Sequence, residues 1–285
     1  MKKIIVKKKG GEKERFNETK LRNSLRNSGV SKKIEDEILA SIKNNIKKDK
    51  DGVVESTKIY KISKDVLKEK ADKKIFLRYN LTSAISKLGP EGFAFEKFIS
   101  LVFKSYGYGP VYVGKKINGK CVVHEMDIVA QRGKDLVTAE LKFHNSRTKK
   151  TDLKVALYMK SRFDDILNSN YYKNNNPIQL IITNTKFTDN AKKYSNCAGV
   201  GVLSWNYPEK DNLHDFILKS KIHPITALET ISQKAKQYFL LRKIVSIEEL
   251  QKNNFKFLNQ NPYIIKSKIQ TVKDEIKDVI ECLGC

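Results

Sequence analysis

An alternating stretch lies near the middle of this chain, Leu136-Val137-Thr138-Ala139-Glu140-Leu141-Lys142-Phe143. Successive side chains of a β-strand point to opposite faces. The stretch therefore predicts a strand with one apolar face and one face that carries Thr138, Glu140 and Lys142. The run from Val122 to Ala130 predicts a neighbouring strand. The middle of the chain is thus predicted to form a β-sheet with an acidic and a basic side chain adjacent on one strand.

The link between these two strands sets their register. A two-residue turn at Gly133-Lys134 pairs Arg132 with Asp135, and the same register puts Asp127 directly opposite Glu140. Opposed residues have Cβ atoms about 5 Å apart, so the two carboxylates repel each other unless a cation lies between them. Such oxygen ligands suit Mg²⁺. A surface hairpin with its charges in water is the alternative that this spacing leaves open.

A third carboxylate precedes the strands. Apolar residues at positions 95, 98, 99 and 102 predict a helix over about 91–106, and Glu96 lies at the edge of its apolar face. Burying a carboxylate costs several kcal/mol unless it is paired or binds a metal. We therefore expect Glu96 to face a partner.

This ordered set of residues resembles the PD-(D/E)xK nuclease superfamily, and within it the Mrr-like type IV restriction endonucleases. The similarity covers about residues 88–206 and implies a restriction-endonuclease-like αβββαβ core. Three segments carry it, namely Gly92-Phe93-Ala94-Phe95-Glu96, His124-Glu125-Met126-Asp127-Ile128 and Glu140-Leu141-Lys142.

The resemblance implies roles for the individual residues. Asp127 and Glu140 would bind Mg²⁺ or Mn²⁺, helped by the carbonyl of Leu141. Lys142 would orient the attacking water or stabilise charge on the phosphoryl group, and Glu96 would hold a water or a second ion. The implied activity is Mg²⁺-dependent hydrolysis of phosphodiester bonds in DNA, in restriction or defence against phage.

Two more side chains share these faces. Glu125 precedes Asp127 on the same face of its strand and is an alternative ligand. His144 shares the face of Lys142, where it either contacts substrate or has a structural role.

The first 90 residues are the most basic part of the chain, with 25 basic and 12 acidic residues. Strand-like runs at 2–9 and 12–16 are joined by Gly10-Gly11, which predicts a β-hairpin with a two-residue turn. Asn17 is a suitable N-cap for the first of four predicted helices. Residues 1–88 are therefore predicted to form one unit.

This unit resembles an ATP-cone, a regulatory nucleotide-binding module. The resemblance implies ATP or dATP as a regulatory ligand, and a basic helical DNA-binding module is the alternative. Lysines that converge on a helix N-terminus suit phosphates, while Glu14 or Asn17 would accept hydrogen bonds from the sugar or base. The predicted nucleotide-binding residues are Val6, Lys8, Lys9, Glu14, Asn17 and Lys20.

Residues 89–220 are assigned to the nuclease domain and residues 221–285 to a small helical C-terminal region, so the chain is predicted to be a multidomain protein of the α+β or α/β class. That region faintly resembles a helix-hairpin-helix unit, but Thr230-Ile231-Ser232 stands where such units have two glycines, so a packing role is predicted. Cys282 and Cys285 are predicted to be free thiols. A heptad-like seam in the last helix predicts a homo-oligomer, and its members are Ile265, Ile269, Val272, Ile276, Val279 and Leu283.

Composition limits the class of protein. The 285 residues include 56 Lys plus Arg and 32 Asp plus Glu, a net charge of +24 that favours nucleic acid as a partner. No long apolar run predicts a membrane span, and the start of the chain has no secretory pattern, so a soluble cytoplasmic protein is expected. Four scattered cysteines fit a reducing compartment.

Two other functions share these features. A nonenzymatic, ATP- or dATP-responsive DNA-binding regulator would use the nuclease-like fold only to dock on DNA. A nuclease acting on RNA or on structured junctions would have the same site and a different substrate. Two opposed carboxylates beside a phosphate favour the DNA endonuclease over the regulator, because a protein that only binds DNA gains nothing from them.

Overall fold

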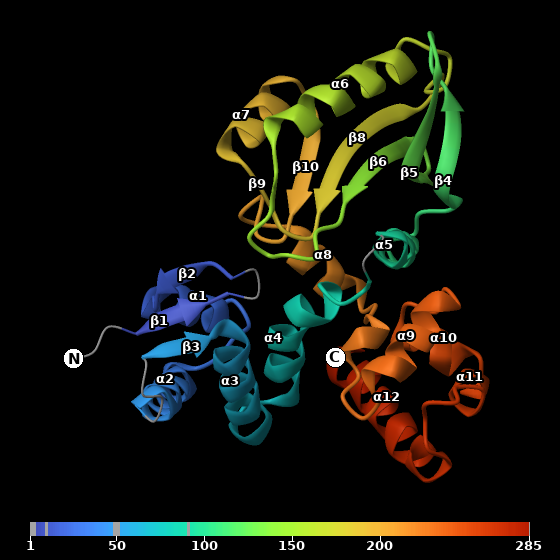
Figure 1. Cartoon of the computed structure of the whole chain (residues 1–285). Coiled ribbons are helices and arrows are strands. Elements are labelled where there is room, and N and C mark those ends of the chain that lie inside the picture. Colours follow the sequence, from blue (N-terminus) through green and yellow to red (C-terminus); the bar gives the residue numbers. More distant parts are fainter. Residues whose placement is uncertain (1–3, 9–10, 48–51, 90–91, 285) are drawn as a thin grey trace. The chain divides into compact units, whose positions relative to one another are not determined.

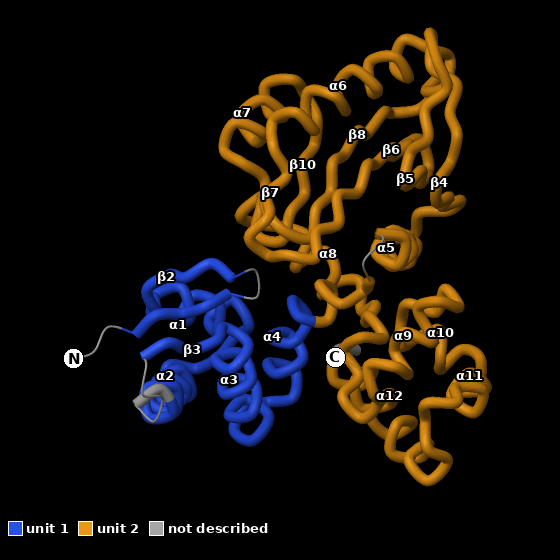
Figure 2. Tube along the Cα trace, in the orientation of Figure 1, with its two compact units in different colours: residues 1–83, 285 blue, residues 84–284 orange. Residues whose placement is uncertain are grey.

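The structure is a computed structural model that describes residues 4–8, 11–47, 52–89 and 92–284. The chain divides into two compact units, residues 1–83 and residues 84–284 (Figure 2). Both contain helices (Figure 1), and each has a β-sheet. The predicted α+β class is confirmed.

The first unit is built on a three-stranded sheet in the order β2-β1-β3. Strands β1 (Ile5–Lys7) and β2 (Lys13–Arg15) form the predicted antiparallel hairpin. Their register joins Lys7 to Lys13, whereas the predicted two-residue turn at Gly10-Gly11 would join Lys7 to Glu14, so the observed pairing is shifted by one residue. Strand β3 (Val53–Glu55) pairs parallel with β1 and was not predicted, because three residues are too few to show an alternating pattern.

Four helices accompany this sheet in the described residues, as predicted. Asn17 caps the first of them, since its Oδ1 accepts a hydrogen bond from the main-chain N–H of Lys20 at 3.0 Å. The helices are α1 (Glu18–Arg26), α2 (Lys32–Lys47), α3 (Ser56–Lys70) and α4 (Lys73–Ile85).

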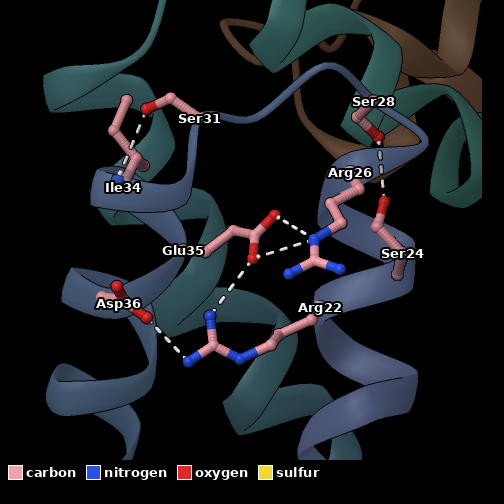
Figure 3. A network of polar contacts seen from close by, with 8 residues as sticks. All are labelled: Arg22, Ser24, Arg26, Ser28, Ser31, Ile34, Glu35 and Asp36. Carbon is pink, nitrogen blue, oxygen red and sulfur yellow. Dashed lines mark hydrogen bonds and ion pairs between the residues drawn. The ribbon is translucent and has the colours of Figure 1, made fainter.

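A buried carboxylate joins α1 to α2 (Figure 3). Glu35 is 1% exposed and accepts hydrogen bonds from Arg26 Nε at 3.0 Å and from Arg22 Nη1 at 3.2 Å. The other terminal nitrogen of Arg22 reaches Asp36 at 2.6 Å. Burying Glu35 is tolerated because two guanidinium groups compensate its charge.

Glu35→Gln is therefore expected to destabilise the first unit by about 1–3 kcal/mol. Breaking a fully buried ion pair costs about 3–5 kcal/mol, and solvent around the arginines reduces that figure here. Urea unfolding of the full chain measures the loss. Asp36→Asn is the control, because that carboxylate is 53% exposed and should contribute less than about 1 kcal/mol. Equal stability of the Glu35→Gln protein and the wild type would contradict a stabilising role for the network.

The second unit contains a five-stranded sheet in the order β10-β8-β6-β5-β4. Strands β6, β8 and β10 are parallel, and β5 runs antiparallel to β6 and β4. Strands β5 and β6 match the two predicted strands within a few residues. Their bounds are β4 (Val111–Asn118), β5 (Val123–Arg132), β6 (Asp135–Lys142), β8 (Asn176–Thr183) and β10 (Gly201–Ser204). A small parallel pair, β7 (Lys150–Thr151) and β9 (Lys186–Phe187), was not predicted.

Helices α6 and α7 lie over one face of this sheet (Figure 1). Asp152 caps α6, and the buried stripe of that helix includes Met159, Phe163 and Ile166. Helix α5 packs against β4 and β5. The bounds of these helices are α5 (Phe93–Ser105), α6 (Leu153–Leu167), α7 (Asp189–Cys197) and α8 (Leu213–Ser220).

The polar face of β6 is buried. Thr138 is 0% exposed and Glu140 is 6% exposed. Helix α6 contributes the arginine that contacts Glu140, and Tyr172, which follows α6, hydrogen-bonds to Thr138. The alternative of a surface hairpin with its charges in water is therefore wrong.

The rest of the second unit is helical, as predicted. The capping box of Ser246 and Glu249 is present. The main-chain N–H groups of Glu229 and Thr230 donate hydrogen bonds to the carboxylate of Glu275. In a helix-hairpin-helix unit, the N–H groups at this place would instead donate to a DNA phosphate. The elements are η1 (Ile225–Ala227), α9 (Gln233–Leu241), α10 (Ile247–Lys252), α11 (Lys256–Asn259), η2 (Lys266–Lys268) and α12 (Ile269–Gly284).

The central part of the heptad-like seam, in α12, packs inside the unit. Val272 and Ile276 are 0% exposed and Val279 is 2% exposed, and α12 contacts α10. The side chain of Leu283 lies outside the described part of the chain. The chain's own helices therefore cover Val272, Ile276 and Val279, whereas Ile265 is 64% exposed and Ile269 is partly exposed, so the homo-oligomer stays a prediction.

Cys121, Cys197 and Cys282 are free thiols, and Cys285 lies outside the described residues. Within the described ranges, no helix has the combined length and apolar character needed to cross a membrane.

Candidate active site

Asp127 lies where β5 separates from β6. The paired residues of β5 and β6 run from Arg132–Asp135 to Ile128–Ala139, which confirms the predicted alignment of the two strands. The paired residues end at Ile128 and Ala139. Beyond them the Asp127 side chain makes the contact with β6, because its Oδ2 accepts a hydrogen bond from the main-chain N–H of Leu141 at 2.6 Å. This bond holds the Asp127 carboxylate against the segment that carries Glu140.

Glu140 lies between two cations. Its Oε1 accepts from Lys142 Nζ at 2.5 Å and its Oε2 accepts from Arg162 Nη1 at 3.0 Å. Arg162 comes from α6 and also donates to the main-chain carbonyl of Glu125. The two cations compensate the charge of a carboxylate that is almost completely buried.

The neighbouring carboxylates are less well compensated. Burial, together with the negative charges of Asp127, Glu140 and Glu125, raises the pKa of Glu96 to about 7. Burial and the charge of Glu140 raise the pKa of Asp127 to about 6, although the hydrogen bond from Leu141 opposes the rise. Burial is the largest cause of both shifts, and the negative charges of the neighbouring carboxylates add to it.

The structure thus brings the predicted catalytic residues Glu96, Asp127, Glu140 and Lys142 into one cluster. Glu125 is exposed and acts on this cluster through its charge.

His144 has a structural environment. Its Nε2 lies 3.1 Å from Thr151 Oγ1, and its main-chain N–H and C=O both hydrogen-bond to the side chain of Asn184. These contacts support the structural role for His144, one of the two roles that the sequence left open.

Arg162 was not singled out in the sequence. A signal was present, because Met159, Phe163 and Ile166 form the buried stripe of α6 and Arg162 lies at its edge. The argument that flagged Glu96, a charge beside an apolar stripe, applies equally to this arginine.

The donor atoms fit a hard divalent cation in kind. Asp127 and Glu140 supply carboxylate oxygens and Leu141 a main-chain carbonyl, the ligands that Mg²⁺ prefers. The charge of Glu140, which adds to the raised pKa of Asp127, also favours a cation at this place. In the described part of the chain, however, no three or more His, Cys, Asp or Glu side chains are arranged to hold a metal ion. Lys142 occupies one oxygen of Glu140 and would have to turn away for an ion to bind there.

A second polar cluster lies at the start of α1 in the first unit. Glu14 Oε2 is 2.9 Å from Lys8 Nζ and 3.3 Å from Lys20 Nζ. The hydrogen bond from Lys8 is the largest effect lowering the pKa of Glu14. Val6 is buried in β1, and Lys9 lies outside the described residues. The structure brings Lys8, Glu14 and Lys20 together beside the Asn17 cap.

No family model matches the chain. An uncharacterized protein of Archaeoglobus fulgidus is 38% identical over 112 residues, which are 39% of this chain and 61% of that protein, so the chain spans less than two thirds of this relative. The crystal structure of a protein of unknown function, AF1548, matches with a TM-score of 0.53 and 28% identity, over 66% of this chain and 98% of that one.

Proposed function

We propose that this protein is a metal-dependent DNA endonuclease that hydrolyses phosphodiester bonds, in restriction or anti-phage defence. The observation that carries the proposal is the cluster of Asp127, Glu140 and Lys142 with Glu96 at the end of a mixed sheet. The raised pKa values of Asp127 and Glu96 support a site that binds a cation rather than a purely structural ion pair.

In this proposal each residue has a role. Asp127 and Glu140 hold Mg²⁺ or Mn²⁺ with the carbonyl of Leu141. The bound metal would lower the pKa of water and offset charge on the scissile phosphate. Lys142, released from Glu140, orients the attacking water or stabilises the phosphoryl oxygens. Glu96, whose pKa of about 7 puts it near half-ionisation at neutral pH, accepts a proton or holds a second ion.

Incubation with supercoiled plasmid and phage DNA tests this proposal directly. Cleavage with Mg²⁺ and none with EDTA is the expected result. DNA binding without cleavage under any divalent metal would favour the nonenzymatic regulator. Cleavage confined to RNA or to branched DNA would favour the other nuclease class.

The same proposal includes regulation through the first unit. An ATP-cone that binds ATP or dATP would place phosphates near Lys8, Lys9 and Lys20 and the N-terminal end of α1. The ammonium groups of Lys8 and Lys20 both contact the carboxylate of Glu14, which supports nucleotide binding at this place. A phosphate that displaced the Glu14 carboxylate would be contacted by both lysines. A homo-oligomer also belongs to the proposal, since two sites held by symmetry would cut both DNA strands.

ATP or dATP is expected to bind the full chain and to stabilise its first unit. At a free ligand concentration of 100 Kd the gain is about 2.7 kcal/mol. Lys8→Ala and Lys20→Ala should remove the heat of binding and the thermal shift, because each deletes a cation facing the phosphates. Lys13→Ala is the control, since Lys13 is an exposed lysine of β2 outside this cluster. Calorimetry that detects no heat with any adenine nucleotide at millimolar concentration would reject nucleotide binding.

A further inference from the structure

The segment that follows Lys142 is held at both ends. At its start the Asn184 side chain accepts from the N–H of His144 at 2.8 Å and donates to its C=O at 2.9 Å. At its end β7 pairs with β9, and the N–H of Thr188 donates to the C=O of Thr151 at 3.0 Å. Hydrogen bonds therefore hold both ends of the segment 145–150 in place.

Three lysines project from this small sheet and its loop. Lys149, Lys150 and Lys186 are all exposed. Lys150 and Lys186 are paired directly across β7 and β9. Like charges at directly opposed positions destabilise a strand pair. Among the residues that the structure describes, no carboxylate lies within ion-pair distance of these three ammonium groups. We call Lys149, Lys150 and Lys186 the basic rim.

The basic rim lies near the candidate active site. Strands β6, β8 and β10 point toward the end of the sheet where β9 lies (Figure 1). Burial lowers the pKa of His144, and the charges of Lys149 and Lys142 lower it further. His144 also contacts Thr151 Oγ1 at 3.1 Å, and Thr151 follows Lys150 in β7, so β7 lies beside the segment that directly follows Lys142.

We propose that the basic rim binds backbone phosphates of duplex DNA next to the bond that the site cleaves. The proposal rests on the proposed nuclease function and names the surface that holds its substrate. A duplex carries a negative charge about every 1.7 Å along its axis, so a track of unpaired cations on one side of the site fits it. The repulsion between Lys150 and Lys186 would be relieved by the bound phosphates.

The test is the salt dependence of DNA binding by the full chain. In the Asp127→Asn background, with EDTA and without cleavage, anisotropy of a fluorescent duplex is measured from 50 to 400 mM salt. The plot of log K against log salt has a negative slope, and each lost phosphate contact reduces the magnitude of that slope by about 0.9. The added triple change Lys149→Gln, Lys150→Gln and Lys186→Gln should lower the slope by about 2–3 and weaken binding at least about tenfold at 100 mM salt.

The matched control removes three charges elsewhere in the same unit. Lys134→Gln, Lys173→Gln and Lys252→Gln change exposed lysines; the first two lie beside the starts of β6 and β8, at the opposite end of those strands from Lys142. The control should keep most of the wild-type slope. Equal slopes for the rim variant and the control would overturn the basic rim, with circular dichroism confirming that both are folded.

The outcomes separate this inference from the proposed function. A lower slope in the rim variant, in a protein whose wild type never cleaves, would keep the rim as a DNA-binding surface and reject the nuclease. Cleavage by the wild type, with no slope change in the rim variant, would reject the rim and keep the nuclease. A wild type without measurable DNA affinity would overturn both.

Discussion

Glu140→Gln, Asp127→Asn and Lys142→Ala should each lower the rate of DNA cleavage by at least about 10³-fold, a loss of about 4 kcal/mol of transition-state stabilisation. The first two remove a charged oxygen ligand, and the third removes the only ammonium group hydrogen-bonded to Glu140 among the described residues. Initial rates on supercoiled plasmid with Mg²⁺ measure the effect.

DNA binding should survive these substitutions. Affinity depends on many phosphate contacts, whereas the chemistry depends on few groups. Glu209→Gln is a matched control in the same unit and should cleave at the wild-type rate, because it removes one exposed carboxylate that is not among the main charges acting on Glu96 or Asp127. Full activity of the Glu140→Gln protein would reject the nuclease assignment, and activity in EDTA would reject its metal dependence.

The pairing of β5 with β6 was predictable because it follows from a short turn. Once Gly133-Lys134 was identified as a two-residue link, the positions of Arg132 and Asp135 fixed the whole register. The burial of the polar face of β6 was harder to predict from the sequence than its pairing with β5. Alternation assigned Glu140 to the polar face, but only the packing of α6 shows that this face is covered.

Other features depended on partners distant in the chain. The seam through Val272, Ile276 and Val279 has coiled-coil spacing, but an apolar stripe packs equally well on its own chain or on another copy, and here it packs within the unit. The predicted register of the first hairpin was wrong by one residue, because a Gly-Gly pair fits connections of more than one length. Asp127 was predicted to face Glu140 but not to accept from the N–H of Leu141, because side-chain hydrogen bonds at a strand end leave no periodic signal.

The raised pKa values of Glu96 and Asp127 predict a pH-dependent stability of the metal-free protein. A carboxyl group whose pKa is raised by folding ionises first in the unfolded chain. Stability is therefore unaffected below the ordinary value of 4.5 for Glu96, falls as the pH rises to about 7, and stays constant above that pH. For Asp127 the same loss runs from 3.8 to about 6.

Glu96→Gln should remove the loss of stability that accompanies the ionisation of Glu96 at higher pH. Thermal unfolding of the second unit without metal should show a Tm about 2–4 °C above wild type at pH 8 and no difference near pH 4. That shift corresponds to about 1 kcal/mol for a domain of this size, and it is kept small because Glu96 is only half-buried and solvent screens part of the repulsion. A Tm of the variant below that of the wild type at pH 8 would mean that Glu96 is stabilised as an anion, contrary to the expected effect of the carboxylates around it.

Mg²⁺ should reverse the loss in the wild type. A cation that binds only the folded protein stabilises it by mass action, and it competes with protons for Asp127 and Glu140. We therefore expect millimolar Mg²⁺ to raise the Tm of the second unit at pH 8, to have little effect near pH 4, and to have none in the Asp127→Asn protein at either pH. Differential scanning calorimetry at both pH values measures all three. An equal Mg²⁺ shift in wild type and Asp127→Asn would place the cation elsewhere on the protein, and no shift in the wild type at pH 8 would show that the cluster does not bind it.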